Sequence, residues 1–162
     1  MKFAQTDREF SGNDIDACSP LVPYDETLLE RSRTQWQFGD WESLSQLNQE
    51  ALQHHPQRAK LALLAAAGRF QLGEENEAHQ YIRLALDWGC SPRLVKQILV
   101  SGVHNTLGVA TALLDSTQRS SAHFRNALKL GGIPGDVDLL VDVRLSRQSV
   151  DILNQKESKQ GK

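Results

Sequence analysis

The chain has 162 residues, enough for one domain with a hydrophobic core but too few for two comfortable ones. Charged residues make up 23%, the formal net charge is -2, and Lys and Arg are scattered among Asp and Glu. Nucleic-acid-binding domains usually carry a basic excess on one face, so we expect no nucleic-acid partner. Cys18 and Cys90 are too few and too far apart to form a disulfide framework.

The two ends of the chain show no structural period. Residues 1–23 contain Gly, Asn, Asp and Pro but no apolar core of signal-peptide length, and we predict a flexible arm. No segment approaches the roughly 20 apolar residues of a membrane helix. We therefore expect a soluble, cytoplasmic protein with one helical domain over residues 24–153 and a disordered polar tail over residues 154–162.

The first part of the domain has the pattern of a helix pair. We predict a helix over residues 24–38, ended by Gly39, which can adopt the positive φ that helix C-termini favour. Asp40 is placed to cap a second helix, which Pro56 follows. The apolar stripe of that second helix has spacings of three and four and consists of Trp41, Leu44, Leu47, Ala51 and Leu52.

A second helix pair follows. Residues 57–72 include the run LALLAAAG, whose Ala content and lack of β-branched residues favour a buried helix over a buried strand. Gly73 ends this helix, and the next helix ends at Gly89. The stripe of the next helix consists of Ala78, Tyr81, Ile82, Ala85 and Leu86.

The third pair begins with a longer helix. We predict that it covers residues 92–114, and that its partner covers residues 118–130. Gly102 and Gly108 either weaken the long helix or allow a neighbour to approach closely. Its apolar positions are Val95, Ile98, Leu99, Val103, Leu107, Ala110 and Leu114.

The segment 136–145 is ambiguous. Val137, Leu139, Val141 and Val143 alternate as in a strand, whereas Val137, Leu140, Val141 and Leu145 fit one face of a helix. We favour the helix, because a helical stack offers no sheet for a strand to join and needs a terminal helix to cover its last apolar face.

The helix pairs repeat with a fixed offset. Phe38-Gly39 recurs as Leu72-Gly73 after 34 residues, and Ala51 recurs as Ala85 after the same interval. Residues 25–134 resemble three tetratricopeptide units, most clearly in the second unit. There, small and aliphatic residues occupy the family's positions as Ala66, Gly73, Ala78, Ile82 and Ala85. The resemblance implies an all-α, right-handed superhelix of about three antiparallel helix pairs with a C-terminal capping helix.

The tetratricopeptide resemblance also implies a binding role. The first helix of each pair lines the concave groove of such a superhelix, where a peptide or protein partner binds. Aromatic, amide and cationic side chains at these positions suit an extended peptide, and the candidates are Arg33, Trp36, Lys60, Phe70, Gln71, His104 and Asn105. Lys60 and Asn105 are the only Lys and Asn among them, so we do not predict the family's full clamp for a C-terminal carboxylate.

Two polar residues interrupt the long apolar helix at His104-Asn105. They are either a ligand-facing pair in the groove or a buried network that fixes the helix register, since buried polar side chains need partners. Elsewhere we find no glycine-rich phosphate loop, no H-E-x-x-H and no C-x-x-C. We therefore predict no enzyme activity, no metal and no cofactor.

Two alternatives stay open beside the binding module. The phrase SGVHNTLG with the following HFRNAL is similar to helical modules that accompany bacterial sulfotransferases, methyltransferases and glycosyltransferases of surface-polysaccharide pathways. That resemblance implies an accessory module without chemistry of its own. The other alternative is a structural protein that forms a homo-oligomer through the long third-unit helix and the C-terminal apolar segment.

Overall fold

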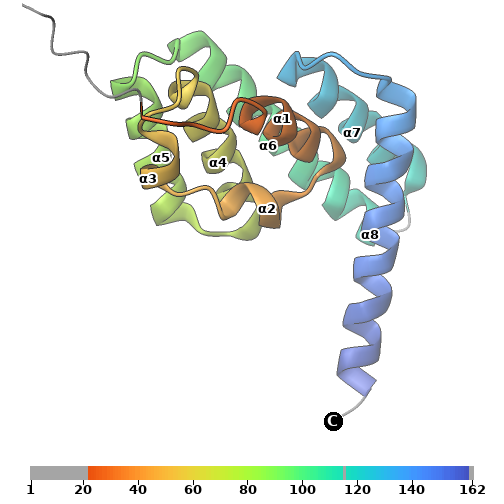
Figure 1. Ribbon diagram of the computed structural model, residues 1–162. Coiled ribbons are helices and arrows are strands. Elements are labelled where there is room, and N and C mark those ends of the chain that lie inside the picture. Colours follow the sequence, from red (N-terminus) through yellow and green to blue (C-terminus); the bar gives the residue numbers. More distant parts are fainter. Residues whose placement is uncertain (1–21, 115, 161–162) are drawn as a thin grey trace, which may run out of the picture.

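The computed structural model describes residues 22–114 and 116–160, and these residues form eight α-helices and no strand (Figure 1). The all-α prediction is therefore confirmed for the described chain, and residues 137–145 of the ambiguous segment are helical. The helices are α1 (Leu28–Phe38), α2 (Trp41–Ser45), α3 (Gln49–Leu52), α4 (Arg58–Leu72), α5 (Glu75–Asp87), α6 (Pro92–Leu113), α7 (Thr117–Gly131) and α8 (Val137–Gln160). Most of the predicted flexible arm, residues 1–21, lies outside the described residues.

Local signals set most of the helix ends. Gly39 and Gly73 end α1 and α4 with φ values of 71° and 80°, the left-handed conformation that glycine adopts without a Cβ clash. Asp40 accepts a hydrogen bond from the backbone N–H of Ser43, and Ser91 accepts one from that of Leu94, so each side chain caps the helix that follows it.

The prediction of one continuous helix from Trp41 to Leu52 is wrong, because the chain forms two short helices there. Asn48 accepts a hydrogen bond from the backbone N–H of Ala51 at 2.8 Å and starts α3. At the break, the carbonyl of Leu47 accepts a hydrogen bond from a side chain. Its donor is the guanidinium of Arg69 on α4, at 2.9 Å. Arg69 is itself buried and stacks on Tyr81 at 3.9 Å.

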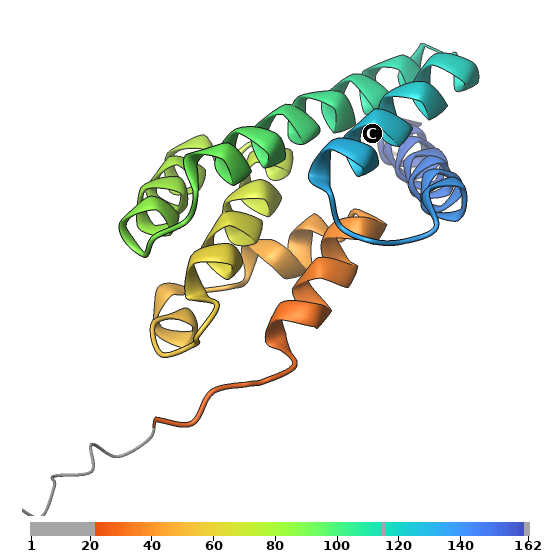
Figure 2. The same ribbon diagram turned by 90° about the horizontal axis from the view of Figure 1, so that it is seen from above.

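The centre of the molecule is α4. It packs against α5, α2, α1, α6 and the short α3, while α6 packs in turn against α7 (Figure 2). Nearly every side of α4 is covered, so residues 61–69 are all buried. None of the described helices is long and apolar enough to cross a lipid bilayer.

The last helix closes the stack. α8 packs on α7 and α6 and returns to α1, at the start of the domain. Gly131, at the end of α7, allows the Trp36 ring of α1 to approach so closely that a Cβ at this position would lie 2.1 Å from a ring carbon. α8 continues to Gln160, past the predicted domain boundary at residue 153, and its C-terminal half extends away from the body (Figure 1).

Candidate functional site

The seven predicted groove residues do not form one surface. Arg33 and Lys60 border one hollow, Phe70 and Gln71 border another, and Trp36 and Asn105 are buried inside the protein. The seventh, His104, is half-buried on α6, where its Nδ1 lies 3.3 Å from Nδ1 of His123 on α7. Over the part of the chain that the structure describes, no group of three His, Cys, Asp or Glu could hold a metal ion.

The first hollow, which we call the α1–α4 pocket, has a volume of about 240 Å³. Arg33 on α1 and Lys60 on α4 supply its two cations. Its other lining residues are aliphatic or glycine: Leu29, Leu63, Leu64, Leu94, Ile98, Gly131, Gly132 and Ile133. Four segments distant in the sequence therefore build one apolar pocket that carries two positive charges.

Neither cation of the α1–α4 pocket is held tightly. Arg33 pairs with Glu30 at 2.8 Å, but the two side chains are 36% and 72% exposed, and such surface pairs contribute little free energy. Within residues 22–114 and 116–160, Lys60 forms no ion pair, and it is exposed. An incoming carboxylate could therefore interact with both groups without breaking a strong ion pair.

The second hollow, about 250 Å³, lies between α4 and α6. Gln71 lines it, but both ends of its amide are already used. Its Nε2 donates to the carbonyl of Gly102 at 3.2 Å, and its Oε1 accepts from Nδ2 of Asn105 at 2.8 Å. Phe70 packs edge-on against the His79 ring with centroids 5.2 Å apart. These contacts tie α4 to its neighbours and leave few free polar atoms for a ligand.

A residue that the sequence reasoning missed, Arg144 on α8, sits at the centre of the buried polar network. It is 3% exposed, and its guanidinium donates to the carbonyls of Trp36 at 2.7 Å and Gln37 at 3.1 Å and to Oδ1 of Asn105 at 2.9 Å. It also lies 5.0 Å from the Trp36 ring and 5.3 Å from the Trp41 ring.

No carboxylate of the described chain forms an ion pair with Arg144. Burial lowers the pKa of its guanidinium well below the ordinary value. The two carbonyls that it binds belong to the last turn of α1, where the helix dipole is negative and favours a cation.

Because Asn105 bridges Arg144 and Gln71, its contacts match the buried-network interpretation of this residue rather than a ligand-facing one. The sequence did hold a signal for Arg144. It follows Leu140 and Val141 by four and three residues, so a lone arginine lies on the apolar stripe of a predicted helix.

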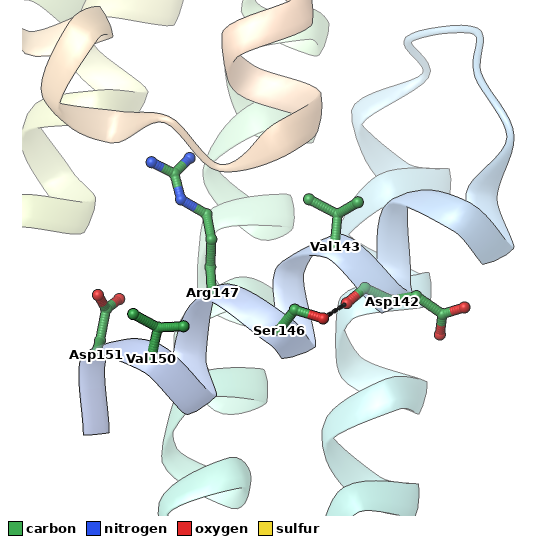
Figure 3. Close-up of a pocket in the computed structure, with 6 residues that line it drawn as sticks. All are labelled: Asp142, Val143, Ser146, Arg147, Val150 and Asp151. Carbon is green, nitrogen blue, oxygen red and sulfur yellow. Dashed lines mark hydrogen bonds between the residues drawn. The ribbon is translucent and has the colours of Figure 1, made fainter. Parts of the chain in front are cut away.

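A third hollow lies along α8. It is shallow and open, about 550 Å³, and one helix supplies all of its lining residues, which are Asp142, Val143, Ser146, Arg147, Val150 and Asp151 (Figure 3). Arg147 points toward α1 and α2, donates to the carbonyl of Phe38 at 3.3 Å and lies 3.9 Å from the Asp40 carboxylate. With so little enclosure, this face is a weaker candidate site than the α1–α4 pocket.

No protein-family model matches the chain, and neither do the curated proteins or the solved structures. The resemblance to tetratricopeptide proteins therefore rests on the residues and the helix order of this chain alone.

Proposed function

We propose that this chain is a non-catalytic protein-interaction module of the tetratricopeptide type, which binds a peptide segment of a protein partner in the α1–α4 pocket. The 34-residue recurrence supports the repeat, because its two Gly positions, Gly39 and Gly73, both end first helices of a pair. In a superhelix of such pairs, α1, α4 and α6 line the concave face.

The observation that carries the binding role is the composition of the α1–α4 pocket. It joins two weakly held cations, Arg33 and Lys60, to an otherwise aliphatic or glycine lining. An aliphatic or aromatic side chain fits the lining, and a neighbouring carboxylate fits the cations. The expected ligand is therefore a peptide segment in which an acidic group lies beside an apolar one.

This assignment changes the predicted set of groove residues. Arg33 and Lys60 stay as ligand-facing groups, and Leu63 and Ile98 join them as apolar lining residues. Trp36 and Asn105 become structural, because they are 2% and 3% exposed and hold Arg144. Trp36 acts through its ring and its backbone carbonyl, and Asn105 through its side chain.

A peptide-display selection on the full chain tests the proposal. We expect enrichment of sequences that pair an acidic residue with an apolar one. The double substitution Arg33→Glu with Lys60→Glu should weaken the enriched peptides by at least about tenfold, measured by fluorescence anisotropy, because it replaces attraction by repulsion. Both side chains lie at the surface, so the fold should survive.

The matched control is Arg83→Glu with Arg119→Glu, which reverses two exposed charges outside the pocket. It changes the net charge equally and should leave peptide affinity within about twofold, apart from weak long-range effects. Enrichment of basic peptides, or equal losses in the two double variants, would contradict binding at this pocket.

A further inference from the structure

From Val100 to its C-cap, Leu114, the helix α6 buries small or polar residues and exposes large apolar ones. The residues that it buries there are small or polar: Ser101 is 1% exposed and Asn105 is 3% exposed, and Gly108 is buried as well. The residues that it exposes are large and apolar: Val100 at 48%, Val103 at 59%, Leu107 at 41%, Leu113 at 55% and Leu114 at 78%. A helix that served only its own monomer would show the opposite arrangement.

Close packing against α7 explains the inner face of α6. A Cβ at Gly108 would lie 2.6 Å from the Phe124 ring, so only glycine allows this approach. The hydroxyl of Ser120 donates to the carbonyl of Gly108, and that of Ser101 donates to the carbonyl of Ala127, both at 2.7 Å. These contacts fix the orientation of α6 and turn its large apolar residues outward.

The exposed residues have a regular spacing. Alternating steps of three and four residues connect Val100, Val103, Leu107, Ala110 and Leu114, which we call the α6 seam. This is the spacing of a helix that packs lengthwise against another helix. Between Lys96 and Asp115 the sequence contains no Asp, Glu, Lys or Arg. A solvated helix face normally carries such charges.

We propose that the α6 seam is a homodimer interface, in which α6 of one copy packs antiparallel against α6 of a second copy. A two-fold interface brings the same patch together from both chains, and an uncharged apolar seam is complementary to itself. In the antiparallel order, Val103 faces Leu107 of the second copy, and Val100 faces Ala110 of the second copy.

Charge favours the antiparallel order over the parallel one. Lys96 continues the seam toward the helix start, and antiparallel pairing places it beside the last turn of α6 in the second copy. The negative end of the helix dipole lies there and attracts a cation. Parallel pairing would instead place Lys96 beside Lys96 of the second copy, where the two charges repel.

The size of the seam indicates a dimer of moderate affinity. Its exposed side chains, with Leu99 and Leu113 beside them, present on the order of 600 Å² per copy, somewhat less than the roughly 800 Å² of a standard interface. Dimerisation should therefore depend on concentration in the micromolar range. None of these residues lines the α1–α4 pocket. A loss of dimerisation and a loss of peptide binding can therefore be told apart.

Sedimentation equilibrium of the full chain over a micromolar concentration series tests the dimer. Val103→Glu should raise the dimer Kd by at least about tenfold, because pairing would bury an uncompensated charge. The control is Leu139→Glu on α8, which places the same charge at a leucine of nearly equal exposure, 57% against 59%. We expect this control to dimerise like the wild-type chain.

A double variant tests the order of the two helices. Val103→Glu with Leu107→Lys places opposite charges in contact across an antiparallel seam but like charges in contact across a parallel one. Recovery of the dimer relative to Val103→Glu supports the antiparallel order, and no recovery overturns it. A wild-type chain that stays monomeric throughout the series, or equal effects of Val103→Glu and Leu139→Glu, overturns the interface itself.

Discussion

The helices α4 and α6 are both long and rich in apolar residues, yet they use these residues in opposite ways. α4 buries nine consecutive residues, Leu61–Arg69, whereas α6 buries Val95, Ile98, Ser101, Asn105 and Gly108 and leaves most of its Val and Leu residues at the surface. The difference follows from position. α4 lies among five helices, and α6 lies along an edge of the molecule (Figure 2). Apolar content therefore does not by itself measure burial.

The largest expected difference in stability comes from the same Leu→Ala substitution on the two helices. Leu61 of α4 is 0% exposed, so Leu61→Ala should lower the free energy of unfolding by about 3 kcal/mol, through lost burial and the cavity left behind. Leu107→Ala removes the same atoms from the exposed seam of α6 and should cost less than about 0.5 kcal/mol. Urea denaturation at concentrations that keep the chain monomeric measures both, and similar losses would contradict the contrast.

The next largest loss of stability is expected at the polar residues on the buried face of α6. Asn105→Ala removes the acceptor for Arg144 and the donor to Gln71, so it should lower the free energy of unfolding by about 2 kcal/mol. The neighbouring Thr106→Ala, at an exposed position, serves as the control and should cost less than about 0.5 kcal/mol. If Asn105→Ala were as stable as this control while peptide binding was lost, Asn105 would be a ligand-facing residue instead.

The smallest expected changes in stability are those of substitutions at the two glycines of α6. A Cβ at Gly108 meets the Phe124 ring at 2.6 Å, so Gly108→Ala should destabilise by about 1 kcal/mol even after its gain in helix propensity. At Gly102 the nearest atom is the amide nitrogen of Gln71 at 3.2 Å, which needs to shift by only a few tenths of an ångström. Gly102→Ala should therefore be neutral or stabilising by up to about 1 kcal/mol in thermal unfolding. The reverse ranking would mean that α7 does not pack this closely on α6.

Some positions of the candidate site could not be inferred from the repeat. The expected groove treats Arg33, Trp36 and Lys60 as equivalent, because all three lie on first helices. In the structure the Trp36 ring faces inward, where the end of α7 and Arg144 of α8 cover it. Arg144 contacts the carbonyl of Trp36 across 108 residues of sequence. No local pattern contains such a pairing, because it depends on how the last helix returns to the first.

The sequence by itself determined the helical class and most helix ends, because their signals lie within a few residues. Gly39 and Gly73 stop α1 and α4 through their backbone conformation, and Ser91 starts α6 through its side chain. Only the tertiary structure decided which face of α6 is buried and that Arg144 and Asn105 meet inside the protein. Whether a residue is buried depends on which helix lies opposite it. In α6 the close packing of Gly108 against Phe124 sets which face turns inward, and the apolar residues on the other face stay exposed.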